Sequence, residues 1–141
     1  MCKEGNASAM ENKRKHMEFI QAAITRMASN CFYLKGWSIA IVAAIVALSI
    51  KESDWKVYAC ALFLTIMFWF LDSYYLRQEK LFRELYEKVA GKGEGAIDFS
   101  MDTSSYQANV PKIPRIMFCN ISVTPFYLSI SIALIVLIHI A

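Results

Sequence analysis

Three long apolar runs divide the chain, and charged or aromatic residues lie at the ends of the first two. They cover about 34–51, 55–74 and 121–141, and the last contains no Asp, Glu, Lys or Arg. A helix needs about 20 mostly apolar residues to cross a hydrocarbon core about 30 Å thick. The first run reaches that length because the long side chain of Lys35 can extend to the interface. The pattern therefore predicts an all-α membrane protein with three transmembrane helices.

Heptad-type patterns continue beyond the first two spans. One precedes the first span and the other follows the second. Apolar or uncharged residues recur there at spacings of three and four, which is typical of helices packed in a coiled-coil manner. They are Met17, Ile20, Ile24, Met27, Cys31 and Leu34 before the first span, and Leu71, Tyr75, Gln78, Phe82, Leu85 and Val89 after the second. We expect a long antiparallel hairpin over 11–90, preceded by a disordered segment 1–10 and followed by a connector 91–120.

The basic residues predict how the spans are oriented. Six Lys or Arg lie in the N-terminal segment up to and including Lys35, and seven lie in 73–120. Two (Lys51 and Lys56) lie at the turn between the first two spans, and none follows the third. Cytoplasmic segments of membrane proteins are enriched in Lys and Arg. The N-terminus, the extension of the hairpin and the connector are therefore expected in the cytoplasm, and the C-terminus in the periplasm.

Composition narrows the possible functions. Hydrophobic residues make up 57% of the chain and charged residues 19%, against about 45–50% and 25% in soluble domains. The four cysteines form no CxxC pair and only two histidines are present, which argues against a disulfide framework or a zinc ribbon. The net charge of +3 is too small for a nucleic-acid-binding protein, and the basic residues are spread over separate segments. The sequence contains none of the common hydrolase or nucleotide-binding motifs, so we expect neither an enzyme nor a cofactor.

A register for the hairpin follows from its outer turn. If the chain pivots near Ser53 and Asp54, position i faces about 107 − i, which places Lys35 opposite Asp72. These are the two full charges closest to lipid, and an unpaired charge costs about 2.5–3.5 kcal/mol at the centre of a span. We predict a Lys35–Asp72 contact that anchors the hairpin at the interface, with a proton or ion relay as the alternative. In the same register Asn30 faces Arg77, and Arg26 has Glu79 or Glu84 one helical turn away. Arg26, Asn30 and Arg77 are therefore the remaining candidates for assembly or gating.

One side of the first span carries only small residues. They are spaced by three or four positions: Gly36, Ala40, Ala44 and Ala47. Small residues at this spacing let helix backbones approach closely in lipid. This face could pack within the hairpin or against a neighbouring subunit.

A second set of polar residues is predicted on the cytoplasmic surface. The candidates for binding a partner protein are Arg83, Tyr86 and Glu87 on the second helix, with Asp98 and Asp102 in the connector. The alternative for 97–106 is a plain connector at the membrane surface.

Three stretches resemble a known family. They are FIQAAITRMASNCFYLKGW (19–37), FWFLDSYYLRQEKLFRELYEKV (68–89) and IDFSMDT (97–103), and as a set they are similar to small bacterial inner-membrane proteins with three predicted spans. The resemblance implies a bacterial inner-membrane location and brings no activity or functional residues with it. In architecture alone, the chain is also similar to small oligomeric membrane effectors of bacterial defence systems.

Two functional hypotheses follow. The first is a homo-oligomeric inner-membrane protein that alters membrane permeability, as a channel or by disrupting the bilayer, with an effector of bacterial defence as one such role. The second is a membrane anchor whose cytoplasmic hairpin binds a soluble protein. A secondary transporter is disfavoured, because three spans provide no internal repeat.

Overall fold

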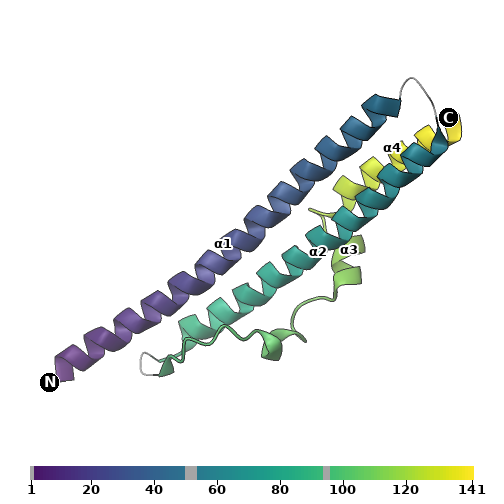
Figure 1. The fold of residues 1–141 in the computed structure, drawn as a ribbon. Coiled ribbons are helices and arrows are strands. Elements are labelled where there is room, and N and C mark those ends of the chain that lie inside the picture. The colour runs from purple at the N-terminus through teal and green to yellow at the C-terminus, as the bar shows by residue number, and fades with distance from the viewer. Residues whose placement is uncertain (1, 50–53, 94–95) are drawn as a thin grey trace.

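The computed structural model describes residues 2–49, 54–93 and 96–141 and contains no strand within them. Two long helices, α1 (Cys2–Ser49) and α2 (Trp55–Gly91), lie side by side along most of their length (Figure 1). The rest of the chain forms a short 3₁₀ helix η2 (Ser104–Tyr106) and the helices α3 (Ile113–Cys119) and α4 (Thr124–Ile140). The residues expected to form most of the outer turn, 50–53, lie outside the described residues.

Helix α1 begins earlier than the sequence pattern predicts. The expectation that segment 1–10 is disordered is wrong for residues 2–10, which are helical and continuous with the remainder of α1. Extending an existing helix costs far less than starting one, and this segment contains no proline that would stop the helix. Helix α1 therefore extends well beyond the region that α2 contacts.

Two apolar clusters hold α1 against α2 at opposite ends of their contact. Ile20 and Ile24 of α1 pack against Leu85 and Val89 of α2. Val42 of α1 packs against Ala61 of α2, and Leu134 of α4 completes that cluster. Residues early in α1 thus meet residues late in α2, so the two helices run antiparallel.

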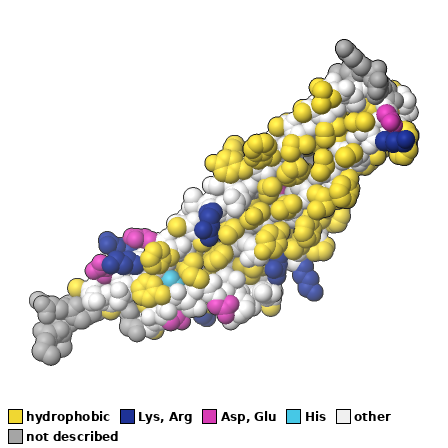
Figure 2. Space-filling view, viewed as in Figure 1, with side chains coloured by type: hydrophobic (Ala, Val, Ile, Leu, Met, Phe, Trp, Pro, Cys, Tyr) yellow, Lys and Arg dark blue, Asp and Glu magenta, His cyan; other side chains and the backbone are white. Residues whose placement is uncertain are grey.

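Both α1 and α2 are long and apolar enough to cross a membrane. Hydrophobic side chains cover the half of the molecule where α4 lies, whereas charged side chains gather mostly in the half that contains the N-terminus (Figure 2). This separation of apolar and charged surface fits a location in a membrane.

The third apolar run differs from a single straight helix over 121–141. Helix α3 precedes it and α4 starts only at Thr124, and the two helices form a bent pair with an angle of 71°. Polar side chains satisfy the backbone at the break: the Asn120 side chain accepts from the Ser122 N–H at 2.9 Å, and the Thr124 hydroxyl donates to the Met117 carbonyl at 3.0 Å. Pro125 lies in the first turn of α4, where proline is tolerated because the N–H there has no helical partner.

A third cluster attaches α3 and α4 to α2. Trp69 of α2 packs against Val123 and Tyr127, with its ring stacked on Tyr127 at a centroid distance of 6.1 Å. The Trp69 indole N–H donates to the Met117 carbonyl at 2.9 Å. One tryptophan therefore fixes both the bend and the first turn of α4.

Candidate functional site

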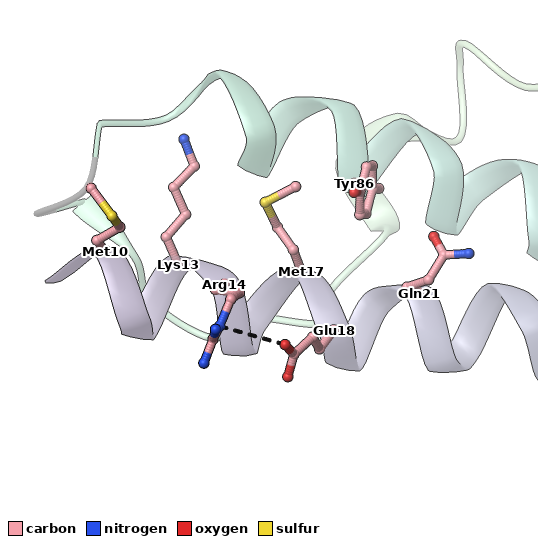
Figure 3. A pocket seen from close by; sticks show the side chains of 7 residues that line it. All are labelled: Met10, Lys13, Arg14, Met17, Glu18, Gln21 and Tyr86. Atoms are coloured by element: carbon pink, nitrogen blue, oxygen red, sulfur yellow. Dashed lines mark ion pairs between the residues drawn. The ribbon is translucent and has the colours of Figure 1, made fainter. Parts of the chain in front are cut away.

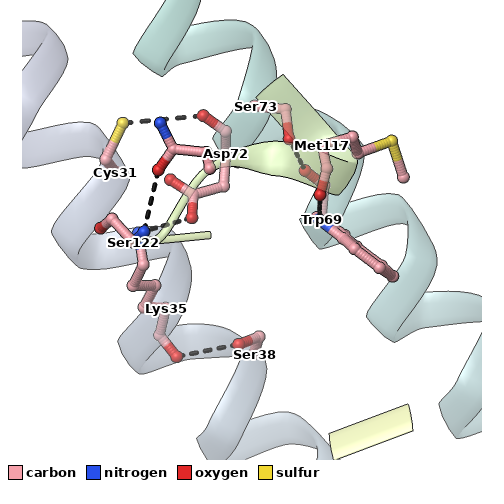
Figure 4. Close-up of polar contacts among 9 residues, drawn as sticks. Cys31, Lys35, Ser38, Trp69, Asp72, Ser73, Met117 and Ser122 are labelled. Atoms are coloured by element: carbon pink, nitrogen blue, oxygen red, sulfur yellow. Dashed lines mark hydrogen bonds and ion pairs between the residues drawn. The ribbon is translucent and has the colours of Figure 1, made fainter. Parts of the chain in front are cut away.

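An ion pair joins α1 to α2 near the middle of the hairpin. The Lys35 Nζ lies 2.6 Å from the Asp72 Oδ2, which confirms the contact predicted from the register (Figure 4). The Asp72 side chain is fully buried, whereas 22% of the Lys35 side chain is exposed. Because isolated charges are strongly disfavoured in low-dielectric surroundings, each of these groups depends on the other.

Small polar side chains surround the pair, and their hydrogen bonds go to backbone carbonyls. Ser38 donates to the Lys35 carbonyl at 2.9 Å, and the Cys31 thiol lies 3.7 Å from the Asp72 carbonyl (Figure 4). Ser73 donates to the Trp69 carbonyl at 2.8 Å. Bonds of this kind satisfy the hydroxyls locally, so these groups leave the Asp72 carboxylate to Lys35.

Helix α4 contributes one further polar atom to this cluster. The Tyr127 hydroxyl lies close to Ser38 and Asp72. Neither this hydroxyl nor the Asp72 Oδ1 has a hydrogen-bond partner among the described residues, although both are buried. Sequence reasoning did not single out Tyr127 or Ser38. Ser38 follows Lys35 by three residues on the same helix face, a spacing that could have placed it at the site.

The other candidates for assembly or gating do not join the ion pair. Arg26 is exposed and makes no ion pair among the described residues, and Asn30 is only half-buried. The Arg77 guanidinium points instead to the connector, where its Nε donates to the Pro111 carbonyl at 3.3 Å. Glu79, a proposed partner of Arg26, is paired with Arg83 at 2.7 Å.

The small-residue face of α1 points away from α2. All four of its residues are exposed: Gly36, Ala40, Ala44 and Ala47. A Cβ atom added at Gly36 would meet no neighbouring atom within 4 Å. Of the two uses considered for this face, packing within the hairpin is therefore excluded.

The partner-binding candidates on α2 lie beside an open groove. Arg83, Tyr86 and Glu87 line a hollow of about 220 Å³ together with Gln21 and Ile24 of α1. It continues into a hollow of about 370 Å³ formed mainly by α1, with Tyr86 as its α2 wall (Figure 3). The structure thus brings three of the five candidates together at one surface.

The two acidic candidates of the connector do not line these hollows. Asp98 accepts from the Ser100 N–H at 3.2 Å and pairs with Lys92 at 3.3 Å, and these contacts lower its pKa. Asp102 accepts from the backbone N–H and the hydroxyl of Ser104 at 2.9 and 2.7 Å, which lower its pKa as well. Both carboxylates organise the connector locally.

The connector is attached to α1 by two residues that the sequence did not reveal. His16 is fully buried, its Nε2 lies 3.0 Å from the Ser100 carbonyl, and its ring lies 5.4 Å from that of Phe99. The Lys13 ammonium donates to the carbonyls of Ala90 and Lys92 at 2.7 and 2.8 Å. A cation that donates to the last carbonyls of a helix stabilises its C-terminus, so Lys13 holds the end of α2.

Comparison with known proteins gives no relative from which the role of these residues could be inferred. No family model, no curated protein and no solved structure matches the chain. Within the described residues, no three His, Cys, Asp or Glu side chains are grouped so that they could hold a metal ion.

Proposed function

We propose that this chain is a homo-oligomeric protein of the bacterial inner membrane that alters membrane permeability. Two helices long enough to span a bilayer support the membrane location. In this proposal the N-terminus and the connector lie in the cytoplasm and the C-terminus in the periplasm, as the distribution of basic residues favours. Helix α4, with α3 lying along the cytoplasmic interface, provides the third span.

The exposed small-residue face of α1 is the observation that carries this proposal. Helix association in lipid depends on close packing, because lipid tails are as apolar as the side chains they would replace. Gly36 and Ala40 present such a face to the outside of the hairpin with no part of the described chain against it. A second subunit is the partner that fits this surface within the bilayer.

We assign the Lys35–Asp72 pair a structural role, which is to hold α1 against α2, rather than a role in ion transport. An ionisable residue inside a membrane is a functional-site hypothesis by default. Here Lys35 neutralises Asp72 directly, at 2.6 Å. The pair therefore holds α1 and α2 in register while α1 presents its outer face to a neighbour.

Induced expression tests the proposal. We expect bacteria that produce the protein to lose membrane potential, measured with a potential-sensitive dye, and purified protein to release ions from liposomes. Ala40→Leu should reduce both effects several-fold, because a larger side chain separates the backbones. Ile39→Leu is the matched control, since Ile39 is exposed and lies outside the small-residue face. Normal potential and tight liposomes with correctly inserted wild-type protein would contradict the proposal.

An anchor for a soluble partner is the second candidate function. The groove lined by Arg83, Tyr86 and Glu87 favours it, since an aromatic residue beside charged groups is typical of protein interfaces. In that case the protein would be a monomer or dimer with no effect on permeability. The number of subunits in bilayer nanodiscs, measured by native mass spectrometry, separates the two functions.

A further inference from the structure

A chain of overlapping hollows follows one side of α1. They extend from Ala7 to Ala40, and neighbouring hollows share lining residues, such as Gln21 in the cytoplasmic half and Tyr33 closer to the membrane half. At 1.5 Å per residue this surface is about 50 Å long. We refer to it as the α1 groove, and Figure 3 shows its part around Arg14.

The connector does not cover the α1 groove. It contacts α1 at His16 and, at one edge of the groove, at Lys13. Arg14 lies about 200° around the helix from His16. Helix α2 borders the groove with Arg83 and Tyr86 but leaves it open. The groove is thus an outer surface of the hairpin.

The lining of the groove changes from charged to apolar along its length, and this change restricts which molecules can fill it. Its first half contains the charged residues Glu11, Lys13, Arg14 and Glu18. The hollow formed by Phe32, Tyr33, Gly36, Trp37 and Ala40 contains no charge. Lipid chains fit only the second part and a soluble protein fits only the first. An occupant of the whole groove must itself be a helix that changes from charged to apolar at the same level.

We propose that the occupant is α1 of a second copy of the chain, packed parallel to the first. This inference rests on the proposed homo-oligomer and specifies how its subunits meet. Copies inserted in the same direction place their charged and apolar halves at the same depth, so the two grooves match along their length. Gly36 and Ala40 permit close approach of the backbones.

The charges along the groove complement themselves in this arrangement. Acidic and basic residues alternate every three or four positions at Glu11, Arg14 and Glu18. The Arg14–Glu18 pair is long, at 3.6 Å, and its side chains are 71% and 64% exposed. Glu11 is already paired with Lys15 of its own helix at 2.8 Å. In the parallel arrangement each Arg14 lies within about one helical turn of Glu18 of the other copy, so the two helices gain reciprocal Arg14–Glu18 contacts.

Disulfide cross-linking between copies tests the inference. Cys2, Cys60 and Cys119 are replaced by serine, while Cys31 is kept because it is buried. In protein reconstituted in liposomes, Gln21→Cys and Ala40→Cys should each form a covalent dimer on mild oxidation. The matched controls Phe19→Cys and Phe63→Cys should not, because both residues are exposed outside the groove. Phe19 lies about 200° around α1 from Gln21, and Phe63 is on α2, which borders the groove only with Arg83, Tyr86 and Glu87.

The outcomes separate this inference from the proposed function. Native mass spectrometry in nanodiscs that shows a single copy overturns both. An oligomer in which the controls cross-link as readily as the groove variants overturns the parallel α1 contact alone. The parallel α1 contact alone is also overturned if Gln21→Cys cross-links only when it is mixed with Glu87→Cys. In that case α2 of the neighbour would fill the groove.

Discussion

At the scale of single residues, the ion pair is the most sensitive position in the hairpin. Removing one partner of a buried pair costs about 3–5 kcal/mol, and the cost is lower where solvent reaches the remaining charge, as it does at Lys35. We expect Asp72→Asn to lower the midpoint of thermal unfolding in detergent, followed by circular dichroism. The double variant Lys35→Asp with Asp72→Lys should recover part of the loss. An unchanged midpoint in Asp72→Asn would show that the pair does not support the hairpin.

Two substitutions at Tyr127 separate what its ring and its hydroxyl each contribute to the stability of the fold. The hydroxyl is buried without a hydrogen-bond partner in the part of the chain that the structure describes, and removing such a group relieves a desolvation penalty. Tyr127→Phe should therefore be at least as stable as the wild type in the same unfolding assay. Tyr127→Ala should lose about 3–5 kcal/mol, because it deletes the ring stacked on Trp69 and leaves a cavity. A destabilised Tyr127→Phe would instead reveal a hydrogen bond between α4 and the ion-pair cluster.

At the scale of elements, the end of α2 and the start of the connector depend on α1. Lys13 donates to the carbonyls of Ala90 and Lys92, and hydrogen bonds from a charged donor contribute about 1.5–3 kcal/mol. We expect Lys13→Met to accelerate amide hydrogen exchange in 86–93 and 96–106. Lys15→Met is the control, because within residues 2–49, 54–93 and 96–141 Lys15 pairs only with Glu11 of its own helix. Equal protection in both variants would mean that apolar packing alone holds this end.

The third apolar run shows how local polar residues set an element's boundary. By hydropathy alone, 121–141 is one span, but α4 begins at Thr124 after a bend of 71°. At that break the Asn120 side chain accepts from the Ser122 N–H, and the Thr124 hydroxyl accepts from the Asn120 N–H and donates to the Met117 carbonyl. Their hydrogen bonds replace those that a continuous helix would make, so a run of apolar residues does not by itself require one straight helix.

At the scale of the whole molecule, the two sides of the hairpin differ. The connector, α3 and α4 pack on one side through His16, Trp69 and Val123, while the α1 groove and the small-residue face stay open. A hairpin covered on one side only has a defined surface left for a neighbouring subunit. This asymmetry is the reason that we favour a homo-oligomer over an anchor for a soluble protein.

The sequence by itself determined the two long helices and the ion pair between them. Apolar runs and heptad spacing depend only on local periodicity, and a tight turn then fixes which positions of an antiparallel pair face each other. The Lys35–Asp72 contact followed from that register. The register did not reveal that the Arg77 side chain bonds to the connector at Pro111, because a long side chain can reach several partners that the pattern does not show.

Only the tertiary structure decided what covers each side of the hairpin. The attachment of the connector through His16 and Lys13, the bend before α4, and the outward direction of Gly36 and Ala40 all depend on contacts between segments distant in sequence. Periodicity shows that a helix has an apolar or small-residue face but not which neighbour that face meets. That choice is made by the packing of all segments together, and it leaves the α1 groove open.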